Sequence, residues 1–350
     1  MSRKIMIILL ITAVIFNLNG CKKAEEKRYE ASFLELFDTM TIVVGYAQDK
    51  EEFSEYAQMI YDKLKEYHEL YDIYHNYEGI NNIKTINDNA GIAPVKVDQK
   101  IIDLLKLSKD TCKLTGGKMN DALGAVLSVW HEYRTEGIDD PDHAKLPPME
   151  LLKEKAKHTN IQDVIINETE STVYLKDSEM RLDVGAIAKG YATEMVSQYA
   201  KEKGFKNGML SVGGNVRTIG SKLDHNKELY WNVGIQNPNL SSEKTNLYIL
   251  NLKDYSLVTS GVYERYYVVD GKKYHHIINP DTLMPAEYFL SVSIVCKDSG
   301  MADALSTAVF NMPYEEGIKL IESLKDTEAL WVMKDGSMSY SSGFQKFIKE

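Results

Sequence analysis

Segments with the alternating hydrophobicity of β-strands are scattered along this 350-residue chain, between segments with the spacing of amphipathic helices. Apolar residues recur every three or four positions in five segments, which predicts helices over 51–71, 100–114, 187–203, 301–311 and 314–324. Alternation predicts strands over 41–47, 172–176, 180–184, 208–213, 231–236, 246–252, 256–260, 264–269, 289–296, 329–333 and 337–340. The order of helices and strands follows no regular βαβ period and contains no internal repeat. We therefore expect an α+β fold, with mixed or antiparallel sheets flanked by helices in a single compact domain.

Composition narrows the class of protein further. Apolar residues make up 44% of the chain and charged residues 26%, the balance of a globular protein. The net charge of −10 argues against nucleic-acid binding, which requires a basic surface. Three cysteines cannot form a disulfide framework. Cys112 and Cys296 lie in apolar patterns and are expected to be small buried side chains.

The N-terminus has the pattern of an export signal. Arg3 and Lys4 precede an apolar run over 5–16, which is shorter than the roughly 20 residues that span a bilayer. Small residues and Cys21 follow at once, which resembles a bacterial lipobox and implies cleavage before Cys21 and acylation of its thiol. The alternative is an ordinary signal peptide with a chance cysteine. We expect a signal peptide over 1–20, a lipidated tether over 21–31 and the folded domain over 32–350.

Two glycine-containing turns are candidate ligand sites. In the segment 182–191 a strand leads through Gly185 and Ala186 to a helix whose first turn includes Lys189. Small residues allow a ligand to approach the backbone, and a helix N-terminus favours phosphate. The segment Ser211–Asn215 ends a strand in two glycines and an amide, a suitable nest for an anion or a nucleotide edge. For each segment alone, an ordinary turn is the competing interpretation.

A possible hairpin carries hydroxyl and imidazole groups. Thr259 and Ser260 end one strand, and His275 and His276 lie beyond a predicted Asp270–Gly271 turn. Neighbouring residues of a strand face opposite ways, so only one of the two histidines can point inward. That histidine is a candidate acid, base or phosphate contact; a solvated pair is the alternative.

A carboxylate and a hydroxyl share a face of the predicted helix 301–311. Asp303 and Thr307 are four residues apart, which places them on one side of the helix. Carboxylate and hydroxyl oxygens suit Mg²⁺, which would take its remaining oxygens from water and substrate phosphates. The alternative is an acidic residue favoured by the helix dipole, with Thr307 packed nearby.

Taken in order, these segments resemble the ApbE family of FAD:protein FMN transferases over about 33–345. The resemblance extends to Phe37–Met40, Asp72–Asn87 and Gly117–Trp130, and to the glycine, histidine and Asp303 segments above. It implies Mg²⁺-dependent transfer of FMN from FAD to a Thr or Ser hydroxyl of an acceptor protein, with release of AMP. The implied acceptors are redox-pump subunits and extracytoplasmic flavoproteins with the motif Asp-x-x-Ser/Thr-Gly-Ala-Ser/Thr.

The resemblance also implies roles for individual residues. Asp303 and Thr307 match metal ligands, and a carbonyl of the Gly185–Ala186 turn would supply another oxygen. His276 is the candidate base, with Asp183 as its rival. The residues implied in FAD binding are Met40, Tyr77, Asn120, Lys189, Gly213, Gly214, Asn215, Thr259, Ser260 and His276. The enzyme would be held by its lipid on the outer side of the bacterial cytoplasmic membrane, or on the periplasmic face in a diderm.

The chain departs from the family pattern at three places. Met119-Asn120-Asp121 replaces a Phe-Asp-Pro-like triplet, Leu283 replaces a turn glycine, and Val262 stands where an Asp is common. These changes leave the Asp303–Thr307 pair and His276 in place. Two other functions remain compatible with the sequence: an FAD pyrophosphatase that makes FMN and AMP at the same site, and an FAD-binding lipoprotein without catalysis.

Overall fold

An eight-stranded antiparallel sheet forms the centre of the protein, for which the computed structural model describes residues 25–225 and 227–350. Every pairing within this sheet is antiparallel. In spatial order the strands are β1 (Lys27–Phe33), β2 (Thr41–Ala47), β6 (Gly208–Val212), β7 (Asn215–Ile219), β12 (Ser256–Gly261), β15 (Phe289–Cys296), β16 (Thr327–Met333) and β17 (Met338–Tyr340).

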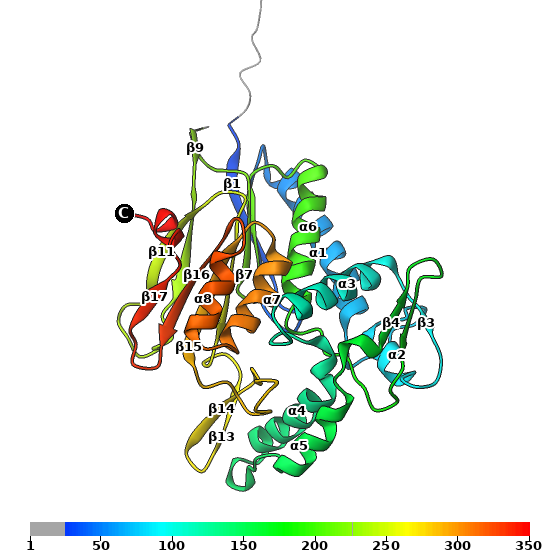
Figure 1. Cartoon of the computed structure of the whole chain (residues 1–350). Helices are drawn as coiled ribbons and strands as arrows, with labels where there is room; N and C mark the ends of the chain where they lie inside the picture. The colour runs from blue at the N-terminus through cyan, green and yellow to red at the C-terminus, as the bar shows by residue number, and fades with distance from the viewer. Residues whose placement is uncertain (1–24, 226) are drawn as a thin grey trace, which may run out of the picture.

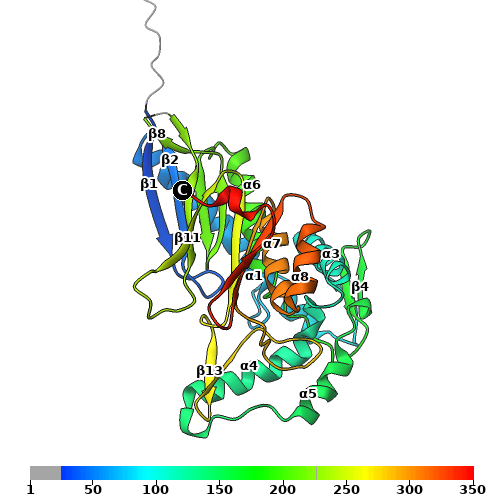
Figure 2. The same ribbon diagram turned by 60° about the vertical axis from the view of Figure 1, so that its left-hand side comes forward.

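Both faces of the sheet are covered. Side chains alternate along a strand, so Val43 of β2 lies in the core on one face and Val44 in the core on the other. The first core contains apolar residues of α1 (Lys50–Tyr71), α3 (Gln99–Leu114), α6 (Ala188–Glu202), α7 (Ser299–Phe310) and α8 (Tyr314–Glu322). The second contains those of β10 (Trp231–Gln236) and β11 (Asn246–Leu252). Figures 1 and 2 show the helices and the β11 ribbon on opposite sides of the sheet.

A smaller lobe extends from one end of the sheet. Helix α4 (Gly124–Asp139) packs against the hairpin of β13 (Tyr266–Val269) and β14 (Lys272–His275), as Figure 1 shows. Trp130, Leu152 and Tyr267 belong to the apolar cluster between these elements. The remaining elements are α2 (Ile83–Asp88), α5 (Met149–Lys155), β3 (Val95–Lys96), β4 (Val164–Asn167), β5 (Thr172–Leu175), β8 (Lys222–Asp224), β9 (Lys227–Leu229), and the 3₁₀ turns η1 (Asp121–Leu123), η2 (Pro141–His143), η3 (Ala156–His158), η4 (Ile161–Asp163) and η5 (Phe344–Phe347).

The predicted α+β class is confirmed, as are the five predicted helices. The strands predicted over 41–47, 231–236, 246–252 and 289–296 have the observed bounds of β2, β10, β11 and β15. The Asp270–Gly271 turn is also confirmed, with positive φ at both residues, as a two-residue hairpin of this type requires. Cys112 and Cys296 are buried free thiols.

The strand predicted over 180–184 is wrong. Met180, Leu182 and Val184 alternate into the core, but no strand pairs with them. Instead the side chain of Asn87 bonds the backbone of Leu182: its Oδ1 accepts from the Leu182 N–H at 2.7 Å and its Nδ2 donates to the Leu182 carbonyl at 2.9 Å. A side-chain amide thus takes the place of a neighbouring strand.

The segment predicted as a tether is folded from Lys27 onward, where β1 pairs with β2 along its whole length. Tyr29, Ala31 and Phe33 pack against the core, while charged residues between them face outward, as an edge strand allows. The predicted signal peptide and Cys21 lie outside the described residues. Within the described part of the chain, no helix is long and apolar enough to cross a membrane.

Candidate functional site

The β6–β7 turn lies against the segment that leads into β2. Gly213 and Gly214 both have positive φ, and the Gly213 N–H donates to the Met40 carbonyl at 3.0 Å. A Cβ on Gly213 would lie 2.6 Å from Oγ1 of Thr39, so this position requires glycine. The structure therefore brings the predicted Met40 next to the predicted Gly213 and Gly214, which directly precede Asn215.

A buried carboxylate lies where α6 and α7 begin. Asp303 is 5% exposed, and its Oδ2 accepts the Gly190 N–H at 2.8 Å. The two helices approach closely at this point, because a Cβ on Gly190 would lie 2.3 Å from the Ser299 carbonyl oxygen. Burial raises the pKa of the Asp303 carboxyl, while Lys189, the Gly190 N–H and the Asn215 amide oppose the rise. Residues from three of the predicted segments thus meet at Asp303.

The oxygen atoms near Asp303 fit a hard divalent cation. Thr307 lies one helical turn beyond Asp303, and the carbonyls of the Gly185–Ala186 turn precede α6. The Gly185 carbonyl is 3.5 Å from Nζ of Lys189, and Lys189 in turn acts on the Asp303 carboxylate. Nowhere in 25–225 or 227–350 do three His, Cys, Asp or Glu side chains group as a metal site. A cation held by one carboxylate, one hydroxyl and a backbone carbonyl would keep positions for water and phosphate oxygens.

His276 follows β14 and is held in one tautomer. Its Nδ1 is 3.1 Å from the Arg265 carbonyl, which can only accept, so Nδ1 carries the proton and Nε2 has the free lone pair. Burial, together with the Arg265 and Arg134 cations, lowers the pKa of His276 to about 3, against the hydrogen bond to the Arg265 carbonyl. The imidazole is therefore neutral at neutral pH.

His275 has a different environment, as the alternation along a strand predicts. Its Nε2 donates to the Ala286 carbonyl at 2.8 Å and its Nδ1 accepts the Ile277 N–H at 3.2 Å. Both ring nitrogens of this buried histidine are thus used within the fold, which leaves His276 as the chemically available one.

Asp183 holds the turn before α6. Its Oδ1 accepts the Gly185 N–H at 2.9 Å, and its own N–H donates to the Asp121 carbonyl at 2.8 Å. Burial raises the pKa of the Tyr74 hydroxyl and lowers that of His131; the charge of Asp183 adds to the first shift and opposes the second. Asp183 therefore lies between the helix layer and the smaller lobe.

Asn120 and Tyr77 have local partners. Nδ2 of Asn120 donates to the Thr159 carbonyl at 3.0 Å, and its Oδ1 accepts the Ala122 N–H at 3.0 Å, which caps η1. The Tyr77 hydroxyl donates to Oδ2 of Asp72 at 2.8 Å. These bonds give both side chains a fixed place in the fold.

The hydroxyls of Thr259 and Ser260 cross-link the sheet to its neighbours. Thr259 Oγ1 is 2.7 Å from Ser293 Oγ on β15, and Ser260 Oγ is 2.8 Å from Ser306 Oγ on α7. Because Ser306 follows Asp303 on the same helix, this contact ties the position of the buried carboxylate to β12.

Two groups that lie beside these residues were not predicted from the sequence to have a role. Arg134 lies on α4, a helix that was not predicted. Burial lowers the pKa of both His276 and His131, and the charge of Arg134 adds to each shift. Asp121 is wholly buried, and neither of its carboxylate oxygens has a hydrogen-bond partner among the described residues. Burial, with the charges of Asp183 and Asp303, raises the pKa of Asp121 to about 8, against the effect of a nearby serine hydroxyl. In the sequence, the one sign that Asp121 is unusual was the Met119-Asn120-Asp121 triplet, which departs from the family pattern.

The loop after Pro280 keeps a glycine-like backbone despite its leucine. Leu283 has a φ of +60°, in the left-handed region that favours glycine. Its side chain is buried, and its carbonyl accepts the Trp130 Nε1–H at 2.9 Å. The replacement of glycine has therefore left this loop bonded to α4.

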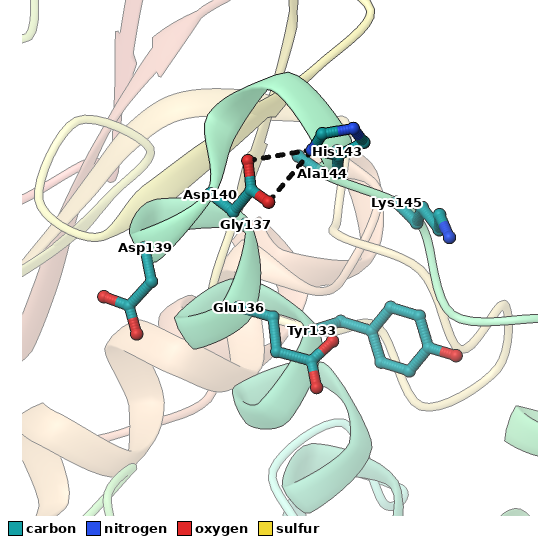
Figure 3. A pocket seen from close by; sticks show the side chains of 8 residues that line it. All are labelled: Tyr133, Glu136, Gly137, Asp139, Asp140, His143, Ala144 and Lys145. Atoms are coloured by element: carbon teal, nitrogen blue, oxygen red, sulfur yellow. Dashed lines mark hydrogen bonds and ion pairs between the residues drawn. The ribbon is translucent and has the colours of Figure 1, made fainter.

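Two surface cavities lie on the smaller lobe. The larger, about 420 Å³, contains none of the predicted site residues; Figure 3 shows the paired Asp140 and His143 among the side chains that line it. The second is an open cleft of about 350 Å³ that includes Arg134 and Arg265, next to His276. This second cleft, which we call the arginine cleft, adjoins the candidate base.

Comparison with known proteins gives consistent matches. The sequence model of the ApbE family matches residues 38–331. An FAD:protein FMN transferase of Treponema pallidum is 35% identical over 272 residues, which cover 75% of this chain and 73% of that protein. One from Klebsiella pneumoniae is 29% identical over 82% of this chain and 84% of its own length. The crystal structure of the ApbE protein of Thermotoga maritima superposes with a TM-score of 0.81 and 28% identity, covering 93% of this chain and all of that one.

Proposed function

The chain belongs to the ApbE family, and from this premise we propose that it is an FAD:protein FMN transferase that moves FMN from FAD to a Thr or Ser hydroxyl of an acceptor flavoprotein and releases AMP. Curated relatives with the same catalytic name, at 29–35% identity over most of the chain, support the enzyme class. The observation that carries the finer proposal is the buried Asp303 carboxylate beside Lys189 and Thr307.

Asp303, Thr307 and a carbonyl of the Gly185–Ala186 turn are proposed to hold Mg²⁺. When bound, the ion would supply positive charge to the pyrophosphate and to the departing AMP. Lys189 contributes a second cation at the same place, and the β6–β7 turn offers the Asn215 amide to the nucleotide.

His276 is proposed as the base. The acceptor hydroxyl passes its proton to Nε2, its oxygen bonds to the FMN phosphorus, and the bond from that phosphorus to the AMP oxygen breaks. The neutral Nε2 is available because Nδ1 is bonded to the Arg265 carbonyl. Asp183 is the less suitable rival, since one of its oxygens already accepts the Gly185 N–H.

We also propose that the protein is exported and lipidated at Cys21. The sequence before Cys21 supports this, and only residues 22–26 separate Cys21 from β1. Even fully extended, five residues reach less than ~20 Å, so the domain would lie close to the membrane surface. Intact mass of the membrane-extracted protein tests this: a diacyl adduct is expected, and its loss in Cys21→Ser.

The transfer is tested by incubating the purified protein with FAD and Mg²⁺, with and without an acceptor domain that carries Asp-x-x-Thr-Gly-Ala-Thr. One added FMN per acceptor, with AMP formed only when the acceptor is present, is the expected result. FMN and AMP without a labelled acceptor would instead identify a pyrophosphatase, and FAD bound without products would identify a binding protein. Asp303→Asn is the inactive control, because asparagine keeps an oxygen for the Gly190 N–H while removing the charge.

A further inference from the structure

Two arginines face the arginine cleft from different elements. Arg134 comes from α4, and Arg265 directly precedes β13; these elements pack together in the smaller lobe (Figure 1). Ile138 and Tyr266 complete its apolar lining, and the acidic Asp38 and Glu264 lie at the cleft as well. The cleft is open to solvent, and Arg265 is exposed.

Neither guanidinium has a counter-ion. No carboxylate in the described part of the chain lies within 4.0 Å of a nitrogen of Arg134 or Arg265, although the protein has 51 acidic residues against 41 basic ones. The one side-chain bond of Arg134 is to a neutral ring, with Nη2 3.0 Å from Nδ1 of His131. Burial, with the Arg265 cation, lowers the pKa of Arg134, so the two positive charges act on one another. Such a pair favours an anion that enters the cleft.

We propose that Arg134 and Arg265 bind a carboxylate of the acceptor protein and thereby orient its hydroxyl toward His276. This inference rests on the proposed function and adds a recognition site to it. The cleft adjoins His276 through the Arg265 backbone, so a group bound there lies beside the base that must meet the acceptor.

The charges of the cleft favour one carboxylate over a diphosphate. Asp38 and Glu264 repel any anion that enters the cleft, and they repel a dianionic pyrophosphate more strongly than a singly charged carboxylate that the two guanidiniums can bind. The pyrophosphate of FAD has its own cationic site at Lys189 and the Asp303–Thr307 pair, on α6 and α7. The open cleft also suits a segment of another protein better than a small molecule that must be enclosed.

The test combines variants of the enzyme with variants of the acceptor. Arg134→Gln and Arg265→Gln are each paired with the acceptor domain and with its Asp→Asn form, in which the motif aspartate is neutral. We expect KM for the acceptor to rise about tenfold in each arginine variant, as for a partly exposed charge-assisted bond, while Kd for FAD stays within about twofold. Against the Asp→Asn acceptor, the wild type and the variants should have similar KM values.

The controls separate binding from folding and from the chemistry. Arg28→Gln, an exposed arginine on β1 far from α4 (Figure 1), should match the wild type in every measurement. Thermal unfolding confirms that each variant is folded, and Arg265→Gln tests an exposed side chain that the fold does not need. An unchanged KM for the acceptor, or an equal rise for both acceptor forms, overturns the inference. A weaker Kd for FAD in the variants overturns it too, by assigning the arginines to the nucleotide. Failure of the wild type to label any acceptor would instead refute the proposed function itself.

Discussion

Replacing Asp121 with asparagine should make the folded protein more stable at neutral pH. The carboxyl is wholly buried with no hydrogen-bond partner among the described residues, and burial with the charges of Asp183 and Asp303 raises its pKa to about 8. The folded chain therefore keeps a proton at pH 7 that the unfolded chain, with an ordinary pKa of 3.8, has released. Asparagine has the same shape and carries no charge at any pH.

The size of the stability change follows from the difference between the pKa values of Asp121 in the folded and unfolded states. Each pKa unit corresponds to 1.36 kcal/mol, so the 3.2 units between 3.8 and pH 7 destabilise the folded wild type by about 4 kcal/mol. Asparagine leaves an amide without partners, at a cost of about 1–3 kcal/mol. We therefore expect Asp121→Asn to raise the free energy of unfolding by about 1–3 kcal/mol at pH 7.

The sign of the pH dependence provides the sharper test. Because folding raises the pKa of Asp121, the ionisation of this group costs the folded state nothing below pH 3.8, where both states are protonated, and the cost grows as the pH rises toward 8. The advantage of the variant should thus grow by about 1.4 kcal/mol per pH unit between pH 5 and pH 7.5. Urea unfolding of both proteins across this range measures the difference, with Asp110→Asn, an exposed carboxylate on α3, as the control. If the difference in unfolding free energy between Asp121→Asn and the wild type stays constant from pH 5 to pH 7.5, the Asp121 carboxyl is not protonated in the folded state.

Three further outcomes follow from the same geometry. Gly190→Ala should lower the free energy of unfolding by about 1–3 kcal/mol, since its Cβ would lie 2.3 Å from the Ser299 carbonyl; unchanged urea unfolding would contradict the close approach of α6 and α7. Asp303→Asn should keep the fold and slow transfer about 100-fold or more, measured as FMN bound to the acceptor; a rate within fivefold of the wild type would exclude a role in charge stabilisation. The pH dependence of kcat/KM for FAD reports the pKa values of the free enzyme. Because the pKa of His276 is about 3, the ring stays unprotonated and able to act as a base above pH 5.5. We therefore expect kcat/KM not to fall with decreasing pH between pH 8 and pH 5.5. An acid limb near pH 6.5 that disappears in His276→Gln would show that this ring is solvated instead.

The parts of the fold that the sequence predicted well are those in which burial alone determines structure. Both faces of β2 and β15 are covered, so their apolar β-branched runs end where the sheet ends. The false strand over 180–184 has the same alternation, but its backbone bonds to the side chain of Asn87. Alternating hydrophobicity shows which side chains are buried, but it does not show which groups the backbone bonds to. The local sequence therefore could not reveal that Asn87, and not a strand, bonds to this segment.

The candidate site likewise contains residues that a local motif predicts and residues that only the fold brings together. Asp303 and His276 belong to compact motifs whose polar residues lie within a few positions of one another, so the sequence alone was enough to propose them as site residues. Arg134 and Arg265 meet only because α4 packs on β13, and α4 itself begins and nearly ends in glycines that weaken its helical signal. Gly124 nonetheless has a structural reason: a Cβ there would lie 2.3 Å from the Arg181 carbonyl.

That close contact fixes the α4 side of the candidate site, which carries Arg134, relative to the α6 side, which carries Lys189. The backbone at Gly124 lies against Arg181, and the Asp183 N–H donates to the Asp121 carbonyl at 2.8 Å, so the start of α4 is fixed to the turn that precedes α6. The α6 side of this junction carries Lys189 and contacts Asp303, while the α4 side carries Arg134 beside His276. A pyrophosphate on the first side and an acceptor carboxylate on the second would be positioned by one rigid backbone junction. On the proposed function, such preorganisation would favour transfer to the acceptor over transfer to water, because the hydroxyl would be held beside the base before the phosphate bond breaks.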